Sequence, residues 1–180
     1  FASSWTSGLT EDTVRRKTAA LNRSRQWIEQ LPADEYRLFN VPSATEVAPY
    51  FRDWVEHETD DDYWRKIRVS DFYNKMSVKA LHAGGWHDIF SGGSIRNFMR
   101  LQKEAPTREA RDGQRLLMGP WAHAATSPEG KIGDVTFGSQ AVLDMNATIV
   151  KWYDFAIKGQ QNEFATAAPV KIFMMGDNVW

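Results

Sequence analysis

The sequence of 180 residues contains no cysteine, which excludes disulfide bonds and thiolate metal ligands. It also lacks an apolar run close to the roughly 20 residues that a membrane-spanning helix needs, so we expect no membrane partner. No signal-peptide pattern is visible, and the first residue is Phe1 rather than Met. We therefore expect the native start to lie upstream, and the sequence indicates no compartment.

A charge excess of one sign is missing as well. The 22 basic and 23 acidic side chains give a formal net charge of −1, which excludes an overall field that attracts nucleic acid or an anionic membrane surface. We expect no nucleic-acid partner.

Several cofactor and metal motifs are absent, namely the P-loop, Gly-x-Gly-x-x-Gly, His-Glu-x-x-His and the EF-hand loop. His57 followed by Asp60–Asp62 offers metal-ligand types. Consecutive acids at a helix start are, however, typical complements of the helix dipole. We predict no cofactor and no metal.

Aromatic residues, by contrast, are abundant, at 13% of the chain with eight Trp among them. In a chain of ordinary hydrophobic content this predicts large buried or pocket-lining rings. A Trp-rich carbohydrate-binding surface is an alternative. It needs exposed coplanar rings, whereas most of these Trp fall on predicted apolar faces.

Helix signals dominate residues 1–74. An amphipathic helix is predicted from Thr10 to about Leu31, a second begins near Pro49, and a short third one opens with the acids of 57–62. The later part alternates strands and helices, which predicts an α/β fold with a buried parallel sheet. Its predicted elements are strand 76–83, a helix from Ser91 with Ile95, Phe98 and Met99 inward, a charged loop 104–114, strand 115–118, helix 139–157 burying Val142, Met145, Ile149, Trp152, Tyr153 and Ala156, and strand 169–175.

Two of the predicted strands end at glycine and are followed by a titratable side chain. The first breaks at Gly84-Gly85 and leads to Asp88, and the second breaks at Gly119-Pro120 and leads to His123. Ligands bind beyond the carboxyl ends of the strands in open α/β sheets. An acid after one strand and an imidazole after a later one match the order Ser…Asp…His of an α/β-hydrolase triad. The sequence contains no Gly-x-Ser-x-Gly elbow for the serine.

Taken singly, each of these residues has an ordinary structural explanation. Asp88 precedes a helix and fits a cap, and His123 fits a loop hydrogen bond. We expect His82 to be a hydrogen-bonded core histidine, His87 to point away from Asp88, and Ser94 to belong to a helix start. The joint placement of Asp88 and His123 is what favours a hydrolase.

Four ordered motifs resemble landmarks of the cocaine esterase / X-Pro dipeptidyl-peptidase family of serine hydrolases, and the similarity runs from about Val55 to Trp180. The motifs are Gly85-Trp-His-Asp-Ile-Phe90, Met118-Gly-Pro-Trp-Ala-His123, Trp152-Tyr-Asp-Phe-Ala-Ile-Lys-Gly159 and Val170-Lys-Ile-Phe-Met-Met-Gly-Asp-Asn-Val-Trp180. The resemblance implies that Asp88 is the aspartate and His123 the histidine of the catalytic triad. It implies that Phe90 lines the acyl pocket.

The same resemblance implies three segments. Residues 1–74 would be part of a helical cap, 75–165 the C-terminal part of an α/β-hydrolase catalytic domain, and 166–180 the start of a C-terminal β-sandwich. The substrate would be a small-molecule ester or a short peptide, cleaved through an acyl-serine intermediate without a cofactor. The nucleophile and the oxyanion hole would lie upstream of Phe1, so we expect the 180 residues alone to be inactive.

Two alternatives remain open. Within the family, the protein would release Xaa-Pro dipeptides or cleave α-amino acid esters, which calls for acidic side chains near the substrate ammonium, and Asp60–Asp62 are the candidates. Outside it, the chain would be a non-catalytic interaction module in which Asp88 and His123 are structural. The sequence indicates neither the acyl and leaving groups nor the oligomeric state.

Overall fold

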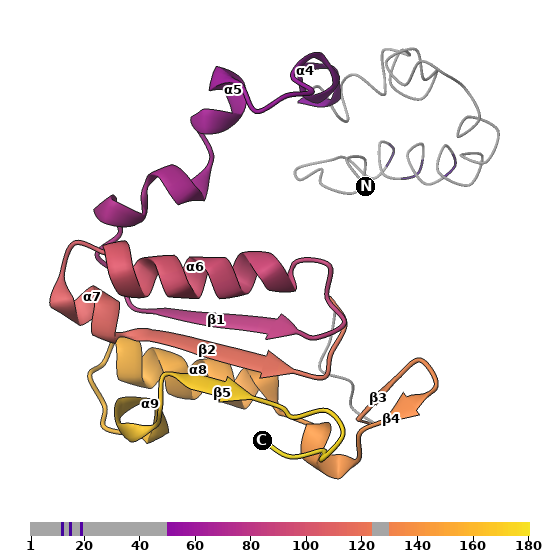
Figure 1. The fold of residues 1–180 in the computed structure, drawn as a ribbon, viewed down its shortest axis with the longest axis vertical. Coiled ribbons are helices and arrows are strands. Elements are labelled where there is room, and N and C mark those ends of the chain that lie inside the picture. The colour runs from indigo at the N-terminus through magenta and orange to yellow at the C-terminus, as the bar shows by residue number, and fades with distance from the viewer. Residues whose placement is uncertain (1–11, 13–14, 16–18, 20–49, 124–129) are drawn as a thin grey trace. The chain divides into compact units, whose positions relative to one another are not determined.

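The structure, a computed structural model, describes residues 12, 15, 19, 50–123 and 130–180 (Figure 1). The chain divides into two units, Phe1–Arg68 and Val69–Trp180. The helix predicted from Thr10 to Leu31 lies outside the described residues, except that residues 12, 15 and 19 are helical.

The first unit contains two short described helices, α4 (Tyr50–Glu56) and α5 (Asp62–Arg65). Helix α4 begins where the sequence predicts. Asp61 is the N-cap of α5, because its carboxylate accepts the Tyr63 backbone N–H at 2.9 Å. Asp61 caps the helix and Asp62 lies in its first turn, as expected of acids at a helix start, whereas Asp60 pairs with Arg68.

His57 belongs to the same local cluster. Its Nδ1 lies 2.5 Å from the Asp61 carboxylate, and its ring stacks on Tyr63 with centroids 4.4 Å apart. Within the described part of the chain, no group of three or more His, Asp or Glu side chains is arranged to hold a metal ion.

The second unit is built on a three-stranded parallel sheet, in the order β1 (Ala80–Gly85), β2 (Gln114–Gly119), β5 (Val170–Ile172). This confirms the α/β class. In register, Gly85 pairs with Gly119 and Met118 with Ile172. The other elements are η4 (Val69–Asp71), η5 (Tyr73–Lys75), α6 (Ser91–Glu104), α7 (Arg108–Asp112), the antiparallel pair β3 (Lys131–Ile132) and β4 (Val135–Thr136), η6 (Ser139–Ala141), α8 (Met145–Ala156) and α9 (Glu163–Thr166).

Helix α6 covers one face of the sheet, and α8 passes behind the strands in Figure 1. Phe98 of α6 forms a buried cluster with Leu116 and Met118 of β2, against which Ile95 and Ile172 pack. Burying a side chain of this size stabilises the fold by roughly 1.5–3 kcal/mol. This cluster joins α6 to β2 and β5 of the sheet.

Four residues expected in the core are exposed instead. Met99 is 62% exposed, Val142 41%, Ile149 37% and Tyr153 52%. Met99 follows the buried Phe98, and a helix turns about 100° per residue, so it lies outside the narrow buried stripe. On α8 the buried stripe centres on Trp152, whose ring contacts Phe155 and Phe164.

The structure also differs from the sequence-based expectation at two segments. Residues 166–180 were expected to begin a separate β-sandwich, but β5 hydrogen-bonds to β2 as a strand of the same parallel sheet, and residues 69–180 form one unit. The charged loop expected over 104–114 contains α7, capped by the Thr107 hydroxyl, which accepts the Ala110 N–H at 3.1 Å. Ala110 is the one apolar residue of α7, so the sequence shows no apolar periodicity that would predict this helix.

A buried polar network ties β1 to β2. Gln114 is fully buried, and its Nε2 donates to the carbonyls of Val78 at 2.9 Å and Ala110 at 2.6 Å. Its Oε1 is therefore left to accept a proton from His82 Nε2, 2.9 Å away. Burial lowers the pKa of His82, which keeps the ring neutral. His82 is thus the hydrogen-bonded histidine that the sequence predicts.

Replacing Gln114 by Leu is expected to lower the free energy of unfolding by about 3 kcal/mol, because the buried Ala110 carbonyl, the partly buried His82 N–H and the Val78 carbonyl all lose their partner. Urea unfolding followed by tryptophan fluorescence measures the loss. The exposed Gln161→Leu variant is the control and should stay within about 0.5 kcal/mol. Equal stability of the two variants would contradict the role of the network.

Candidate active site

The two site loops start from neighbouring strand ends and stay together beyond them. The Trp86 backbone N–H donates to the Gly119 carbonyl at 2.9 Å, and the His87 N–H donates to the Trp121 carbonyl at 3.0 Å. The pairing of β1 and β2 is thereby extended past the sheet edge. Asp88 and His123 are the next side chains with ionisable groups along the two loops.

Glycine is required where the loops approach each other. A Cβ atom on Gly85 would fall on the carbonyl of Trp121, and one on Gly119 would fall on the Trp121 ring. Only a residue without a side chain allows this close approach. The glycine breaks in the sequence are therefore the local cause of the site geometry.

Asp88 and His123 lie in contact. Nδ1 of His123 is 3.2 Å from Oδ1 and 3.3 Å from Oδ2 of Asp88. The carboxylate side chain is 10% exposed and the imidazole side chain 61% exposed. Nδ1 of the ring thus faces the carboxylate, and much of the remaining imidazole is exposed. A carboxylate at Nδ1–H favours the tautomer with a bare Nε2 and stabilises the imidazolium that forms when Nε2 accepts a proton.

The Asp88 carboxylate is held in its ionised form. Its pKa is lowered mainly by the Phe90 backbone N–H, which donates to Oδ1 at 2.8 Å, and secondly by His123. Because the folded pKa lies below the unfolded one, the interaction stabilises the fold above the unfolded value of about 3.9 and is lost as the pH falls through the folded value.

A carbon-13 NMR titration of the Asp88 carboxyl should accordingly show a midpoint below that of aspartate in an unstructured peptide. In a His123→Ala variant the midpoint should rise yet stay below the peptide value, because the Phe90 N–H is the larger cause. A midpoint at the peptide value in the unmodified protein would contradict the geometry.

Phe90 lies beside the pair formed by Asp88 and His123. Its ring meets the His123 ring edge-on, with centroids 4.7 Å apart and planes at 66°, and the residue is 46% exposed. The ring thus both touches the imidazole and keeps surface for a bound molecule.

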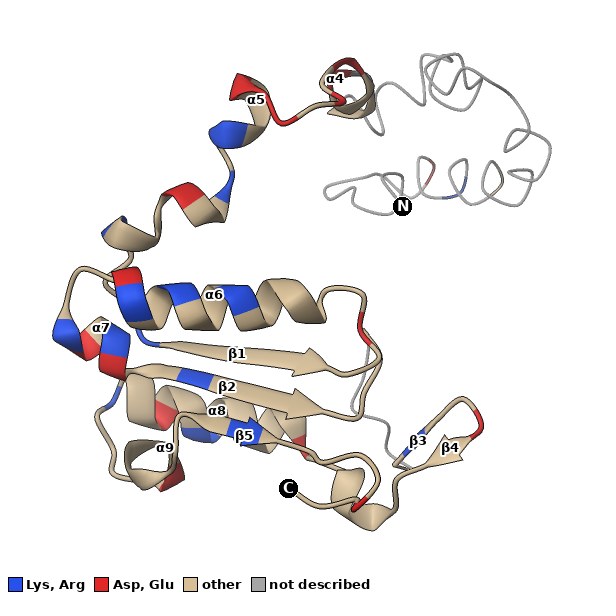
Figure 2. Ribbon diagram, viewed as in Figure 1, with Lys and Arg blue, Asp and Glu red and all other residues tan. Residues whose placement is uncertain are grey.

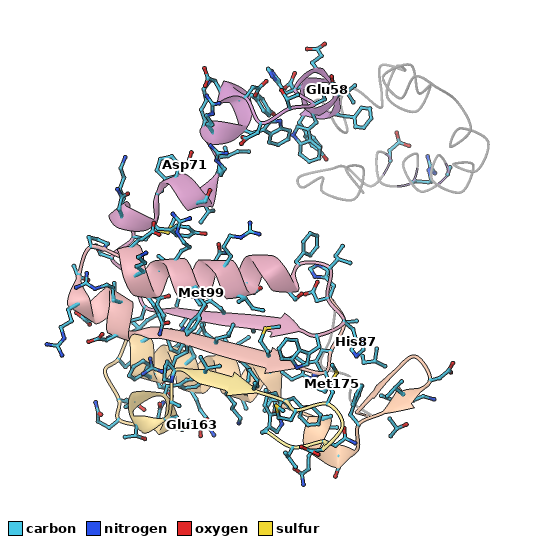
Figure 3. The ribbon with its side chains drawn as sticks, viewed as in Figure 1. Glu58, Asp71, His87, Met99, Glu163 and Met175 are labelled. Atoms are coloured by element: carbon cyan, nitrogen blue, oxygen red, sulfur yellow. The ribbon has the colours of Figure 1, made fainter. Side chains whose placement is uncertain are left out.

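The other candidates of the sequence analysis lie elsewhere. The His87 ring packs against Phe137, 5.8 Å between centroids, at the end of the sheet where Met175 is also labelled in Figure 3. Ser94 belongs to the first turn of α6. His57 and Asp60–Asp62 belong to the first unit.

A cavity of about 590 Å³ adjoins the pair and runs between β1 and α8. Among the lining residues that the structure describes, Asp88 bears the one carboxylate. Met145, Ile149 and Tyr153, which the sequence assigned to the core, line it because they share one face of α8 with Trp152. The lining residues are Leu81, Ala83, Gly84, Gly85, Asp88, Trp121, Ala122, His123, Met145, Ile149, Trp152 and Tyr153.

Charge is sparse around these strand ends. Figure 2 shows Lys, Arg, Asp and Glu spread over α5, α6 and α7, whereas the arrowheads of β1 and β2 are uncharged. Among the described residues, no helix has the length and apolar character needed to cross a membrane.

Comparison by sequence finds a matching family and a known relative. The family model of X-Pro dipeptidyl-peptidase (S15 family) matches residues 2–125. Cocaine esterase of Rhodococcus sp. (strain MB1 Bresler) is 29% identical over 129 residues, which are 70% of this chain and 21% of the esterase.

A solved structure of a selenomethionine-labelled α-amino acid ester hydrolase superposes with a TM-score of 0.58 at 23% identity, covering 77% of this chain and 23% of that one. The chain thus spans about a fifth of the length of these relatives. The structural match shows the shared α/β fold, and the family match covers more than two thirds of the sequence. The chain belongs to the X-Pro dipeptidyl-peptidase (S15) family, as the four motifs predicted.

Proposed function

We propose that the complete protein carrying this chain is a serine hydrolase that cleaves acyl ester or amide bonds. In it Asp88 is the aspartate that orients the imidazole, and His123 is the histidine that transfers the proton. The observation that carries the proposal is the contact between the Asp88 carboxylate and His123 Nδ1 beyond two adjacent parallel strands. Membership of a family with hydrolase relatives supports it.

The reaction would proceed through an acyl-enzyme. Nε2 of His123 accepts the proton of a serine hydroxyl while the serine oxygen bonds to the substrate carbonyl carbon. The bond to the leaving group then breaks, and Nε2 returns the proton to the departing oxygen or nitrogen. Water repeats the sequence on the acyl-serine and releases the acid. The serine would lie on a part of the protein outside these 180 residues, since the sequence has no Gly-x-Ser-x-Gly elbow.

An uncharged acyl group fits the site better than one with a free ammonium. The described cavity lining is largely apolar, and Asp88, the one carboxylate among these described residues, is engaged by His123. Asp60, Asp61 and Asp62 also have partners within their own unit. Asp60 pairs with Arg68, Asp61 with His57, and Asp62 with Arg65. Esterase activity is therefore favoured over release of Xaa-Pro dipeptides or cleavage of α-amino acid esters.

The test compares two substrates on the complete protein, a nitrophenyl ester of an uncharged acid and Ala-Pro-nitroanilide. We expect a higher kcat/KM on the ester and covalent labelling by a fluorophosphonate. A higher kcat/KM on the dipeptide anilide would move the assignment to the peptidase branch. No turnover and no labelling would favour the non-catalytic interaction module. The 180 residues alone should hydrolyse the ester no faster than free imidazole.

A further inference from the structure

We infer that Trp86 and Trp121 are positioning residues that set the distance between Asp88 and His123. The inference rests on the proposed function. Each of the two reactive side chains stands two residues after a tryptophan, and each of these tryptophans hydrogen-bonds through its indole to a backbone carbonyl of another chain segment.

The two anchors come from segments far away in sequence. Trp86 Nε1 donates to the Phe173 carbonyl at 2.9 Å, just after β5, and Trp121 Nε1 donates to the Ala141 carbonyl at 3.2 Å, at the end of η6. Each loop is thereby hydrogen-bonded to a segment, around Phe173 or Ala141, that carries neither Asp88 nor His123.

The two accepting carbonyls belong to residues of a well-packed hydrophobic cluster. Phe173 and Ala141 are each 1% exposed and form one buried cluster with Phe137, against which Ile132 and Trp180 pack. Close-packed groups of this kind move little. An indole that is hydrogen-bonded to this cluster is therefore held in a defined position relative to the sheet.

Trp121 couples the two loops directly. Its carbonyl accepts the His87 N–H, one residue before Asp88, while its own side chain precedes His123 by two residues. Trp121 lines the cavity beside the pair, yet only 3% of the residue is exposed, so little of it can contact a substrate. A displacement of Trp121 would shift both the carboxylate and the imidazole. Misplacement of catalytic groups by about 1 Å lowers rates on the order of 10²-fold.

The experiment compares Trp121→Phe and Trp86→Phe with Trp180→Phe in the complete protein. Trp180 is a matched control. Its indole also donates to a backbone carbonyl, that of Gln140 at 2.7 Å, and its ring contacts Trp121 and Phe173. It lies on neither of the two loops that carry Asp88 and His123. Each variant removes one indole N–H and keeps an aromatic ring.

We expect Trp121→Phe to lower kcat by about 10-fold or more, with KM changed less than about twofold. Trp86→Phe should act in the same direction. Trp180→Phe should lower Tm and leave kcat within about twofold. A kcat loss shared equally by all three variants, or one that lies in KM, would overturn the inference. Should Trp121→Phe fail to fold, Trp86→Phe decides, and a kcat loss below about threefold overturns the inference.

An Asp88→Asn variant measured in parallel separates the two proposals. If Asp88→Asn keeps full activity, the proposed function itself fails. If Asp88→Asn loses activity while Trp121→Phe and Trp86→Phe match Trp180→Phe, only the positioning role fails.

Discussion

Replacing Asp88 by asparagine in the complete protein is expected to lower kcat by about 10⁴-fold with the fold intact. An amide at this position can donate an N–H to Nδ1, which favours the imidazole tautomer with its proton on Nε2. In that tautomer Nε2 cannot accept the proton of the serine hydroxyl. Losses near 10⁴ follow the same change in a chymotrypsin-type triad. Steady-state kinetics on the nitrophenyl ester give the ratio.

The matched control is Asp134→Asn, which makes the same chemical change on an exposed side chain of the turn between β3 and β4. It should keep kcat within about twofold, as expected of a surface change away from the site. Undiminished turnover in Asp88→Asn would remove Asp88 from the mechanism.

Replacing Gly85 by alanine should destabilise the protein by about 3 kcal/mol and abolish hydrolysis. The added methyl group would occupy the place of the Trp121 carbonyl, and a backbone atom in a close-packed region gives way only if the two loops separate. Because the His87 N–H bonds to that carbonyl, the separation would break the link that brings Asp88 to His123. Thermal unfolding and ester hydrolysis measure the two effects.

Gly93→Ala is the control for this change. Gly93 lies inside α6, and a Cβ atom there meets no other atom within 4 Å. Alanine favours a helix over glycine by about 0.5–1 kcal/mol, so this variant should be as stable as the unmodified protein or more so, with unchanged kcat. A Gly85→Ala variant that matches it in stability would contradict the close approach of the loops.

The contact between Asp88 and His123 was predictable because its causes are local. Each loop is preceded by an apolar strand, and each strand ends at a glycine followed within a few residues by the reactive side chain. Parallel strands that are neighbours in the sheet end at the same edge. The sequence pattern thus contained both the carboxylate and the imidazole and the reason that they meet.

The cavity lining, the indole hydrogen bonds and the place of β5 depend on tertiary contacts, which the pattern of residues along the sequence does not reveal. Ile149 and Tyr153 have the spacing of a buried helix face, yet they line a cavity because Trp152 alone packs deeply. The indole bonds of Trp86 and Trp121 end on carbonyls, and every residue has a carbonyl, so no residue type marks the acceptor. Likewise the place of β5 beside β2 is set by tertiary pairing, which residues 170–172 do not encode by themselves.

The protonation of the His123 ring tests the central claim most directly. Nitrogen-15 NMR of the complete protein, with both ring nitrogens of histidine labelled and at a pH where the rings are neutral, identifies the tautomer of each ring. His82 supplies the internal reference, since Gln114 fixes its proton on Nε2. We predict the opposite tautomer for His123, with the proton on Nδ1 facing Asp88 and a bare Nε2. A proton on Nε2 of His123 would contradict the account.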